Sequence, residues 1–266
     1  MEVIIQPSAD DAAALVARIV AARMRLKPDL VLGLATGRTM ERVYACLARM
    51  HADHSLDFAR CRTFNLDEYV GLAPDDPRSY RYYMNAKLFT HINIPRAQTF
   101  LPDGMARDLG AECRAYEQRI SAAGGIDLQL LGLGVVGHIG FNEPLSAMQS
   151  RTREKALTPQ TREQNKEMFN GDPERVPHRA LTMGVGTILD AREVVMLVTG
   201  AAKARILAQA IEGPITAMIS ATALQLHPNC KVVVDEAAAV HLKGQEYYRW
   251  VFEHEPEWEE FRRSET

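Results

Sequence analysis

The chain has 266 residues, of which 47% are hydrophobic and 24% are charged, the mix of an ordinary globular protein. Its 31 lysines and arginines and 34 acidic residues give a formal charge of −3, which excludes a broadly basic nucleic-acid-binding protein and an acidic disordered chain. No apolar run reaches the ~18–20 residues of a membrane span, and the N-terminal residues predict no secretory signal. The four cysteines are widely spaced and predict reduced thiols. We therefore expect a cytoplasmic enzyme with no nucleic-acid or membrane partner.

Short apolar runs alternate with segments of helical periodicity along the chain. This alternation predicts βαβ units, and hence a mostly parallel α/β sheet with helices on both faces. In chain order, the pattern predicts a helix at 8–24, a strand at 29–35, a helix at 39–50, a strand ending at 63–65, a helix at 106–122, strands at 127–133, 180–183 and 194–198, a helix at 202–212 and a strand at 231–235.

The chain has no Pro/Ser/Gly-rich linker and no internal repeat, so we expect a single domain over residues 1–243. Residues 244–266 form a C-terminal extension that is rich in aromatic side chains. Such aromatics most often belong to a helix that packs on the body of the protein or on a neighbouring subunit. The six aromatics of the extension are Tyr247, Tyr248, Trp250, Phe252, Trp258 and Phe261.

Ligands of an open parallel sheet bind beyond the carboxyl ends of its strands, so the segments that follow the strands are the candidate sites. After the strand at 29–35 come Thr36, Gly37, Arg38 and Thr39, where backbone N–H groups at a helix start can hold an anion. After the strand at 194–198 comes Lys203, again in a first helical turn. Cations are unfavourable near a helix N-terminus unless an anion is present. An ordinary tight turn and an exposed lysine are the alternatives, but together these residues predict a phosphate site.

Two acidic residues, Asp67 and Glu68, follow the strand that ends at 63–65. An acidic pair at a strand end is as often a helix cap with a solvated neighbour as a functional site. A carboxylate at this edge of the sheet can also act as a general base. We expect Asp67 on a surface loop, where its replacement would leave folding intact.

The glycine-rich segment 132–144 holds the closest grouping of residues that indicate a functional site. His138 and Glu143 lie five residues apart within it, beside Asn142 and Pro144. A lone histidine is most often structural, but a histidine among glycines with a nearby carboxylate favours proton transfer. The segment lacks a dinucleotide-binding fingerprint. The other histidines have no metal-ligand spacing, and we assign no metal site.

Taken together, these segments resemble the glucosamine-6-phosphate deaminase family, also called glucosamine-6-phosphate isomerases. The resemblance covers residues 1–243 and implies a Rossmann-like, mostly parallel sheet. The segments that carry it are 64–71, 137–144, 150–153, 180–190 and 224–228.

The resemblance implies an enzyme of amino-sugar catabolism that converts glucosamine 6-phosphate and water to fructose 6-phosphate and ammonia without a cofactor. Asp67 matches the base that moves a proton between C2 and C1, and an ordinary aspartate pKa near ~3.9 would leave it ionised at neutral pH. His138 matches the residue that opens the sugar ring, and Glu143 matches the carboxylate that supports it. Glu68 would shape the site. Thr36, Gly37, Thr39 and Lys203 match positions around the phosphate.

The sequence departs from the family pattern at three places. Val136 stands where the family usually has Asp or Asn, so the histidine would depend on Glu143 alone. Arg38 and Met40 replace the usual Gly and Pro, and Glu167 aligns with an arginine that contacts the phosphate in several members. We hypothesise that Arg38 replaces this lost charge, with help from Lys166.

Some oligomeric members of the family are activated by N-acetylglucosamine 6-phosphate at a subunit interface. Ser146, Arg153 and Lys155 match three residues of that site, which would accompany a homo-oligomer, a trimer or a hexamer. Local ion pairs are the alternative role for the two cations, and exposed pairs contribute little.

Three alternative functions remain open. The substrate could be another hexosamine phosphate such as galactosamine 6-phosphate, since the sequence does not determine the preferred C4 epimer. A 6-phosphogluconolactonase-like hydrolase ranks lower, because the lactonase does not carry the segment 141–144 (Phe-Asn-Glu-Pro). A catalytically weakened sugar-phosphate-binding regulator would explain Val136 and Glu167, whereas the retained Asp67 and His138 argue against it.

Overall fold

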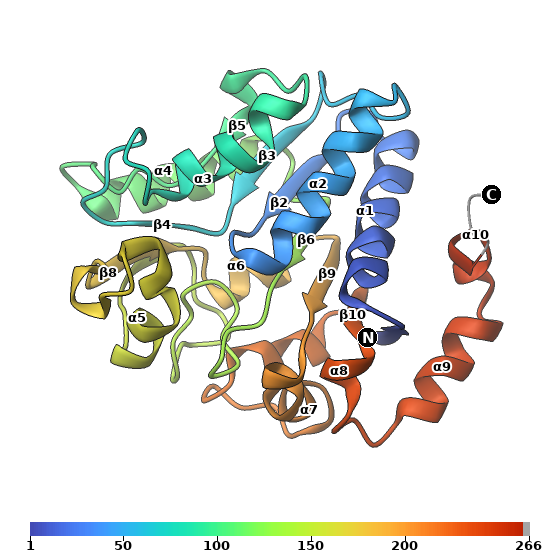
Figure 1. The fold of residues 1–266 in the computed structure, drawn as a ribbon. Helices are drawn as coiled ribbons and strands as arrows, with labels where there is room; N and C mark the ends of the chain where they lie inside the picture. The colour runs from blue at the N-terminus through green and yellow to red at the C-terminus, as the bar shows by residue number, and fades with distance from the viewer. Residues whose placement is uncertain (263–266) are drawn as a thin grey trace.

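Residues 1–262 are described by a computed structural model, in which seven parallel strands form the central sheet (Figure 1). The order is β1-β10-β9-β6-β2-β3-β5, so neighbouring strands are joined by long crossovers. Strands such as 31–34 and 128–131 are fully buried apolar runs, as expected for strands covered on both faces. The strands are β1 (Glu2–Gln6), β2 (Val31–Leu34), β3 (Arg62–Asn65), β5 (Thr99–Phe100), β6 (Leu128–Leu131), β9 (Glu193–Val198) and β10 (Cys230–Asp235).

Helices lie on both sides of this sheet, with α1 and α2 on one side and α6 on the other (Figure 1). The predicted α/β class, with its mostly parallel sheet, is therefore confirmed. Each helix predicted from the sequence is present, with ends shifted by up to three residues. The helices of the body are α1 (Ala9–Leu26), α2 (Arg38–Ala52), α3 (Tyr80–Lys87), α4 (Leu109–Ala122), α5 (Pro159–Asn165), α6 (Val185–Leu189), α7 (Ala204–Glu212) and α8 (Glu236–Ala239).

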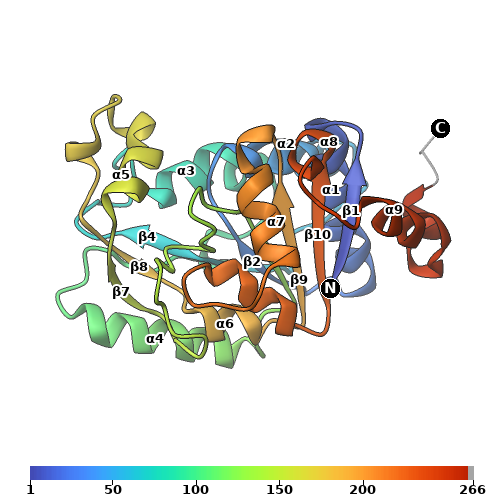
Figure 2. The same ribbon diagram turned by 90° about the horizontal axis from the view of Figure 1, so that it is seen from below.

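A second, antiparallel sheet joins β4 (Asp67–Tyr69), β8 (Arg179–Thr182) and β7 (Arg153–Ala156) in that order (Figure 2). The strand predicted at 180–183 exists, but it belongs to this small sheet and not to the parallel one. A short apolar run looks the same in either sheet, and only its pairing partners distinguish them. Leu66 connects the two sheets: its N–H donates to Leu34 of β2, and its carbonyl accepts from Met183.

The C-terminal segment packs against the edge strand β1. It consists of α9 (Gln245–His254), a 3-10 turn at Pro256–Trp258 and α10 (Glu259–Arg262). Trp258 is fully buried and donates its indole N–H to Glu2 of β1, while Trp250 is half exposed. The predicted packing of aromatics on the body therefore holds for Trp258. Residues 263–266 of the predicted extension lie outside the described part. Within residues 1–262, no helix is long and apolar enough to cross a membrane.

Candidate active site

A cavity of about 560 Å³ lies beyond the carboxyl ends of β2, β3 and β6. This is the position expected for a ligand site in a parallel α/β sheet. Seven residues predicted from the sequence line it: Thr36, Gly37, Arg38, Thr39, Asp67, His138 and Lys203. Glu68 and Glu143 do not line the cavity, so the four predicted catalytic residues divide into two that face it and two that lie elsewhere in the core.

Asp67 is the first residue of β4, at the point where the chain leaves the parallel sheet for the antiparallel one. Its side chain is 6% exposed, so the expectation of a surface loop is wrong. Burial, with a further contribution from the neighbouring Glu68, raises the pKa of Asp67 to about 8. The expectation that Asp67 has an ordinary pKa is therefore also wrong. A carboxyl group with a pKa close to neutral is well suited to accept and return a proton.

Glu68 has its carboxylate fully engaged by the backbone. Its Oε1 accepts the N–H groups of Tyr69 and Tyr80 at 2.8 and 3.0 Å, and its Oε2 accepts that of Arg81 at 2.9 Å. Burial nevertheless raises the pKa of Glu68 to about 7. Since two of the three donors begin α3, Glu68 caps that helix and has no oxygen directed at the cavity wall.

His138 lies in the loop that follows β6. The loop closes tightly, because the N–H of Gly134 donates to the carbonyl of His138 at 2.9 Å. A Cβ on Gly134 would lie 2.1 Å from Nε2 of His138, so only glycine leaves room for the imidazole. A Cβ on Gly140 would lie 3.5 Å from Oδ2 of Asp67. The loop that carries His138 therefore passes directly against the Asp67 carboxylate.

Glu143 lies close to His138 without a direct hydrogen bond. The distance from Nδ1 of His138 to Oε2 of Glu143 is 3.8 Å, and Nδ1 has no hydrogen-bond partner in the described residues. Glu143 accepts the N–H of Thr158 at 3.0 Å and its hydroxyl at 3.3 Å. Burial lowers the pKa of His138, and Glu143 partly offsets this effect. The imidazole is therefore neutral at pH 7 and can both donate and accept a proton.

The opposite part of the cavity is built to hold an anion. α2 begins at Arg38 directly after Gly37, so its first N–H groups have no partner within the helix. Lys203 enters from the 3-10 turn after β9, and burial lowers its pKa to about 8. No hydrogen bond or ion pair joins the Lys203 ammonium to another described residue. A half-buried ammonium of this kind gains most from an anionic ligand.

The guanidinium of Arg38 lies 3.8 Å from the carboxylate of Glu167, and both side chains line the cavity. Both are largely exposed, so the pair itself is weak. Lys166 does not line the cavity, and its ammonium lies 2.5 Å from Glu163. Of the two cations suggested to replace the lost family arginine, only Arg38 is therefore at the site.

The three predicted allosteric residues lie outside the cavity. Arg153 donates to Ser146 at 2.9 Å and to Asn142 at 2.9 Å, both in the loop that follows His138. Lys155 lies on the same strand, β7, and pairs with Ala180 of β8 through the backbone. Ser146 and Arg153 are thus in contact, and Arg153 connects β7 to the loop that follows His138.

Among the residues that line the cavity and were not predicted from the sequence are Tyr80 and Tyr83, because α3 was not predicted. The helix has a recognisable start signal, since the side chain of Ser79 accepts the N–H of Tyr82 as an N-cap. The helical periodicity of its hydrophobic residues is hard to recognise, because this short helix consists largely of aromatic and basic residues. The sequence therefore contained a signal for the start of α3, but none for the tyrosines reaching the site.

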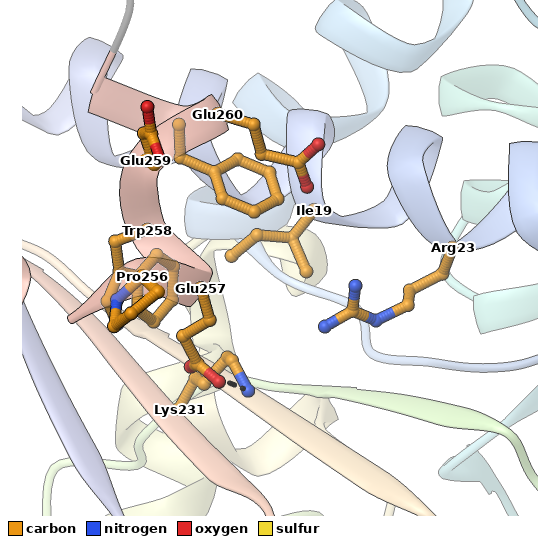
Figure 3. A pocket seen from close by; sticks show the side chains of 9 residues that line it. Ile19, Arg23, Lys231, Pro256, Glu257, Trp258, Glu259 and Glu260 are labelled. Atoms are coloured by element: carbon orange, nitrogen blue, oxygen red, sulfur yellow. Dashed lines mark ion pairs between the residues drawn. The ribbon is translucent and has the colours of Figure 1, made fainter.

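A second cavity, of about 470 Å³, lies between α1 and the C-terminal segment (Figure 3). Its two cations, Arg23 and Lys231, face acidic partners of the protein itself. Glu193 pairs with both, at 2.6 and 3.2 Å, and Glu257 lies 3.6 Å from Lys231. This cavity therefore marks where the C-terminal segment packs on the body, at the end of the sheet opposite the candidate site.

Comparison with known proteins agrees with this geometry. Residues 6–233 match the family model of glucosamine-6-phosphate isomerases and 6-phosphogluconolactonase. Proteins named glucosamine-6-phosphate deaminase from Arthrobacter sp. (strain FB24) and Streptomyces coelicolor are 49% and 48% identical over 259 residues, 97% of this chain and 99% of each relative.

The solved structure of a monomeric glucosamine-6-phosphate deaminase superposes with a TM-score of 0.88 at 44% identity, covering 90% of this chain and 99% of that one. A 6-phosphogluconolactonase from Trypanosoma cruzi gives a TM-score of 0.73 at 20% identity, covering 91% and 97% of the two chains. The second likeness concerns the fold alone.

Proposed function

The chain belongs to the family of glucosamine-6-phosphate isomerases and 6-phosphogluconolactonases, and from that premise we propose the roles of its residues in the deamination of glucosamine 6-phosphate. The reaction isomerises and deaminates glucosamine 6-phosphate, with water, to fructose 6-phosphate and ammonia. One observation supports these roles above all others. A buried carboxyl group, Asp67, and a neutral histidine, His138, line the same cavity as an anion site at the start of α2.

Ring opening comes first, because the C2 proton becomes acidic only beside the open-chain aldehyde. A neutral imidazole can take the proton of the C1 hydroxyl and return one to the ring oxygen. His138 has this form, since burial lowers its pKa. Glu143, 3.8 Å from Nδ1, stabilises the positive charge that develops while the imidazole holds two protons.

The second step moves a proton between carbons. Asp67, once ionised, removes the proton from C2, and the substrate's own ammonium group gives a proton to O1, which yields a neutral enolamine. Asp67 then returns its proton to C1. The product is the imine of fructose 6-phosphate, which water hydrolyses to the ketone and ammonia. A base with a pKa of about 8 suits both halves of this step, because it accepts a proton from carbon and also gives it back.

The phosphate group fits the other part of the cavity. There the free N–H groups at the start of α2 and the side chains of Thr36 and Thr39 offer donors, while Arg38 and Lys203 offer charge. Holding the phosphate at this end directs the sugar carbons toward Asp67 and His138. Binding the remote phosphate thereby orients the reacting carbons.

Ammonia release over a panel of substrates tests this proposal. We expect turnover with glucosamine 6-phosphate and none with 6-phosphogluconolactone, and galactosamine 6-phosphate reports the C4 preference. Calorimetry with the same compounds identifies a regulator: tight binding of glucosamine 6-phosphate without any ammonia release would refute the enzymatic role.

We extend the proposal to an effector site at Ser146, Arg153 and Lys155. Its support is the pair of hydrogen bonds from Arg153 to Ser146 and Asn142, which connects this surface to the loop carrying His138. N-acetylglucosamine 6-phosphate should then lower the KM of the wild type but not of Arg153→Ala. Sedimentation with and without this compound tests for the oligomer that such a site would need.

A further inference from the structure

Helix α3 connects the two halves of the site. Its first residues bind Glu68, the neighbour of Asp67 on β4, and its Tyr83 reaches the loop before α2. We propose that Glu68 and Tyr83 are positioning residues, which hold the phosphate-binding loop at a fixed place relative to Asp67 through α3. This proposal rests on the proposed function and states how Glu68, expected from the sequence to shape the site, would do so.

Glu68, at one end of this connection, is buried, and both of its carboxylate oxygens accept hydrogen bonds. The carboxylate accepts the N–H groups of Tyr80 and Arg81, the first two residues of α3, at 3.0 and 2.9 Å. These donors have no partner within the helix, and a negative charge is favourable at a helix N-terminus. Because Glu68 and Asp67 are adjacent on β4, α3 is attached at its start to the strand that carries the base.

The Tyr83 end reaches the anion site. The phenol of Tyr83 donates to the carbonyl of Gly37 at 2.9 Å, and that carbonyl also accepts the N–H of Met40. One turn earlier on α3, Tyr80 lines the same cavity as Thr36, and its hydroxyl donates to that of Tyr69 of β4 at 3.3 Å. Helix α3 is thus joined to the loop through Tyr83 and to β4 through Tyr80.

The peptide bond between Gly37 and Arg38 is planar, so the Tyr83 hydrogen bond to the Gly37 carbonyl also orients the Arg38 N–H. In a trans peptide the carbonyl of Gly37 and the N–H of Arg38 point in opposite directions. With the carbonyl held toward Tyr83, the Arg38 N–H is directed away from α3. It is the first N–H of α2, so it has no partner within the helix. Tyr83 therefore sets the direction of a donor at the anion site.

Tyr83→Phe tests this proposal, with Tyr82→Phe as its matched control. Tyr82 is the preceding residue of α3, its side chain is 43% exposed, and no hydrogen bond of its hydroxyl is present in residues 1–262. We expect Tyr83→Phe to raise the KM for glucosamine 6-phosphate and the Kd for inorganic phosphate by the same factor, about 2- to 12-fold, with kcat unchanged. Tyr82→Phe should leave all three at the wild-type value.

Glu68→Gln tests the role of Glu68. The direction in which it changes the Kd for inorganic phosphate decides the outcome. Loss of positioning weakens the binding of inorganic phosphate, whereas mere removal of a negative charge near the cavity strengthens it. We expect at least a twofold higher Kd for phosphate in a variant whose circular dichroism matches the wild type. A lower or equal Kd would overturn the role of Glu68.

Calorimetry with inorganic phosphate keeps this inference separate from the proposed function. A wild type that binds phosphate but releases no ammonia would contradict the function and leave the positioning test intact. Equal phosphate affinity in Tyr83→Phe and Tyr82→Phe would contradict the positioning role, even if both variants deaminate the substrate.

Discussion

Arg38 and Glu167 form an ion pair at the candidate phosphate site, with 3.8 Å between the guanidinium and the carboxylate. The two residues come from α2 and from a 3-10 turn that follows α5, and both line the cavity. A phosphate would compete with Glu167 for the same guanidinium. In the proposed binding mode, Glu167 would therefore oppose substrate binding and Arg38 would support it.

The Arg38–Glu167 pair predicts opposite effects for its two members. Glu167→Gln should lower the KM by roughly 1.4- to 5-fold, the range expected for an exposed pair. Arg38→Ala should raise the KM and the Kd for inorganic phosphate by about 3- to 10-fold, because it removes a charged donor. Steady-state kinetics and calorimetry check both values. Unchanged phosphate affinity in Arg38→Ala would remove Arg38 from the binding site.

Asp67→Asn should reduce turnover by about 10²- to 10⁴-fold, the usual contribution of a general base. Retention of near-normal activity would contradict the role of Asp67. Folding should persist, because asparagine is isosteric with aspartate and uncharged.

The same variant makes a prediction about stability. The folded-state pKa of Asp67, about 8, lies above the unfolded value of ~3.9. The folded protein therefore holds this proton more tightly, and the resulting stabilisation is complete below about pH 4 and is lost as the pH rises through 8. The asparagine side chain is neutral at every pH, so Asp67→Asn should melt higher than the wild type at pH 9, and the difference should shrink at pH 5. If the melting temperatures of Asp67→Asn and the wild type differ by the same amount at pH 9 and at pH 5, this ionisation is refuted.

The pH profile of kcat/KM should have its maximum near pH 8. Activity rises toward pH 8 as Asp67 ionises, and falls above it as Lys203, with a pKa of about 8, loses the charge that attracts the phosphate. The Kd for inorganic phosphate should also rise above pH 8. A profile that stays flat down to pH 5 would mean that the base has an ordinary carboxylate pKa.

Glu143→Gln should lower kcat by about 10- to 100-fold, less than the loss of a general acid–base group itself. Glu143 offsets part of the fall in the His138 pKa, so its neutral replacement makes the imidazole a weaker base. The Kd for inorganic phosphate should stay the same, since Glu143 does not line the cavity. Glu163→Gln, at an exposed pair with Lys166, is the control. Equal kcat in the two variants would show that Glu143 does not support His138.

Trp258→Ala should destabilise the protein by about 3 kcal/mol, within the range for truncating a buried aromatic side chain. Trp250→Ala, in the same segment but half exposed, should change stability by less than about 0.5 kcal/mol. Denaturant unfolding measures both. Activity well below the melting temperature should be normal in each variant, since Trp258 contacts Glu2 at the end of the sheet opposite the site.

The sequence by itself determined the class of the fold and seven of the residues that line the cavity. Short, largely apolar runs such as 31–34 and 128–131 are typical of strands covered on both faces, and residues just after parallel strands gather at one edge of the sheet. For this reason Thr36, His138 and Lys203 could be grouped before any contact was known. The helix predicted to start at residue 8 begins one residue later, at Ala9, with Ser8 as its N-cap.

Only the tertiary structure decided how these residues behave. Asp67 belongs to an antiparallel strand and is buried, and burial moves its pKa from an ordinary value to about 8. Glu68, adjacent to it in the sequence, is directed to α3 instead of the cavity, and Tyr83 reaches Gly37 from 46 positions away in the sequence. Sequence patterns report which side chains a strand or helix presents along its own axis. Desolvation, and contacts between residues far apart in the chain, arise only when the elements pack together.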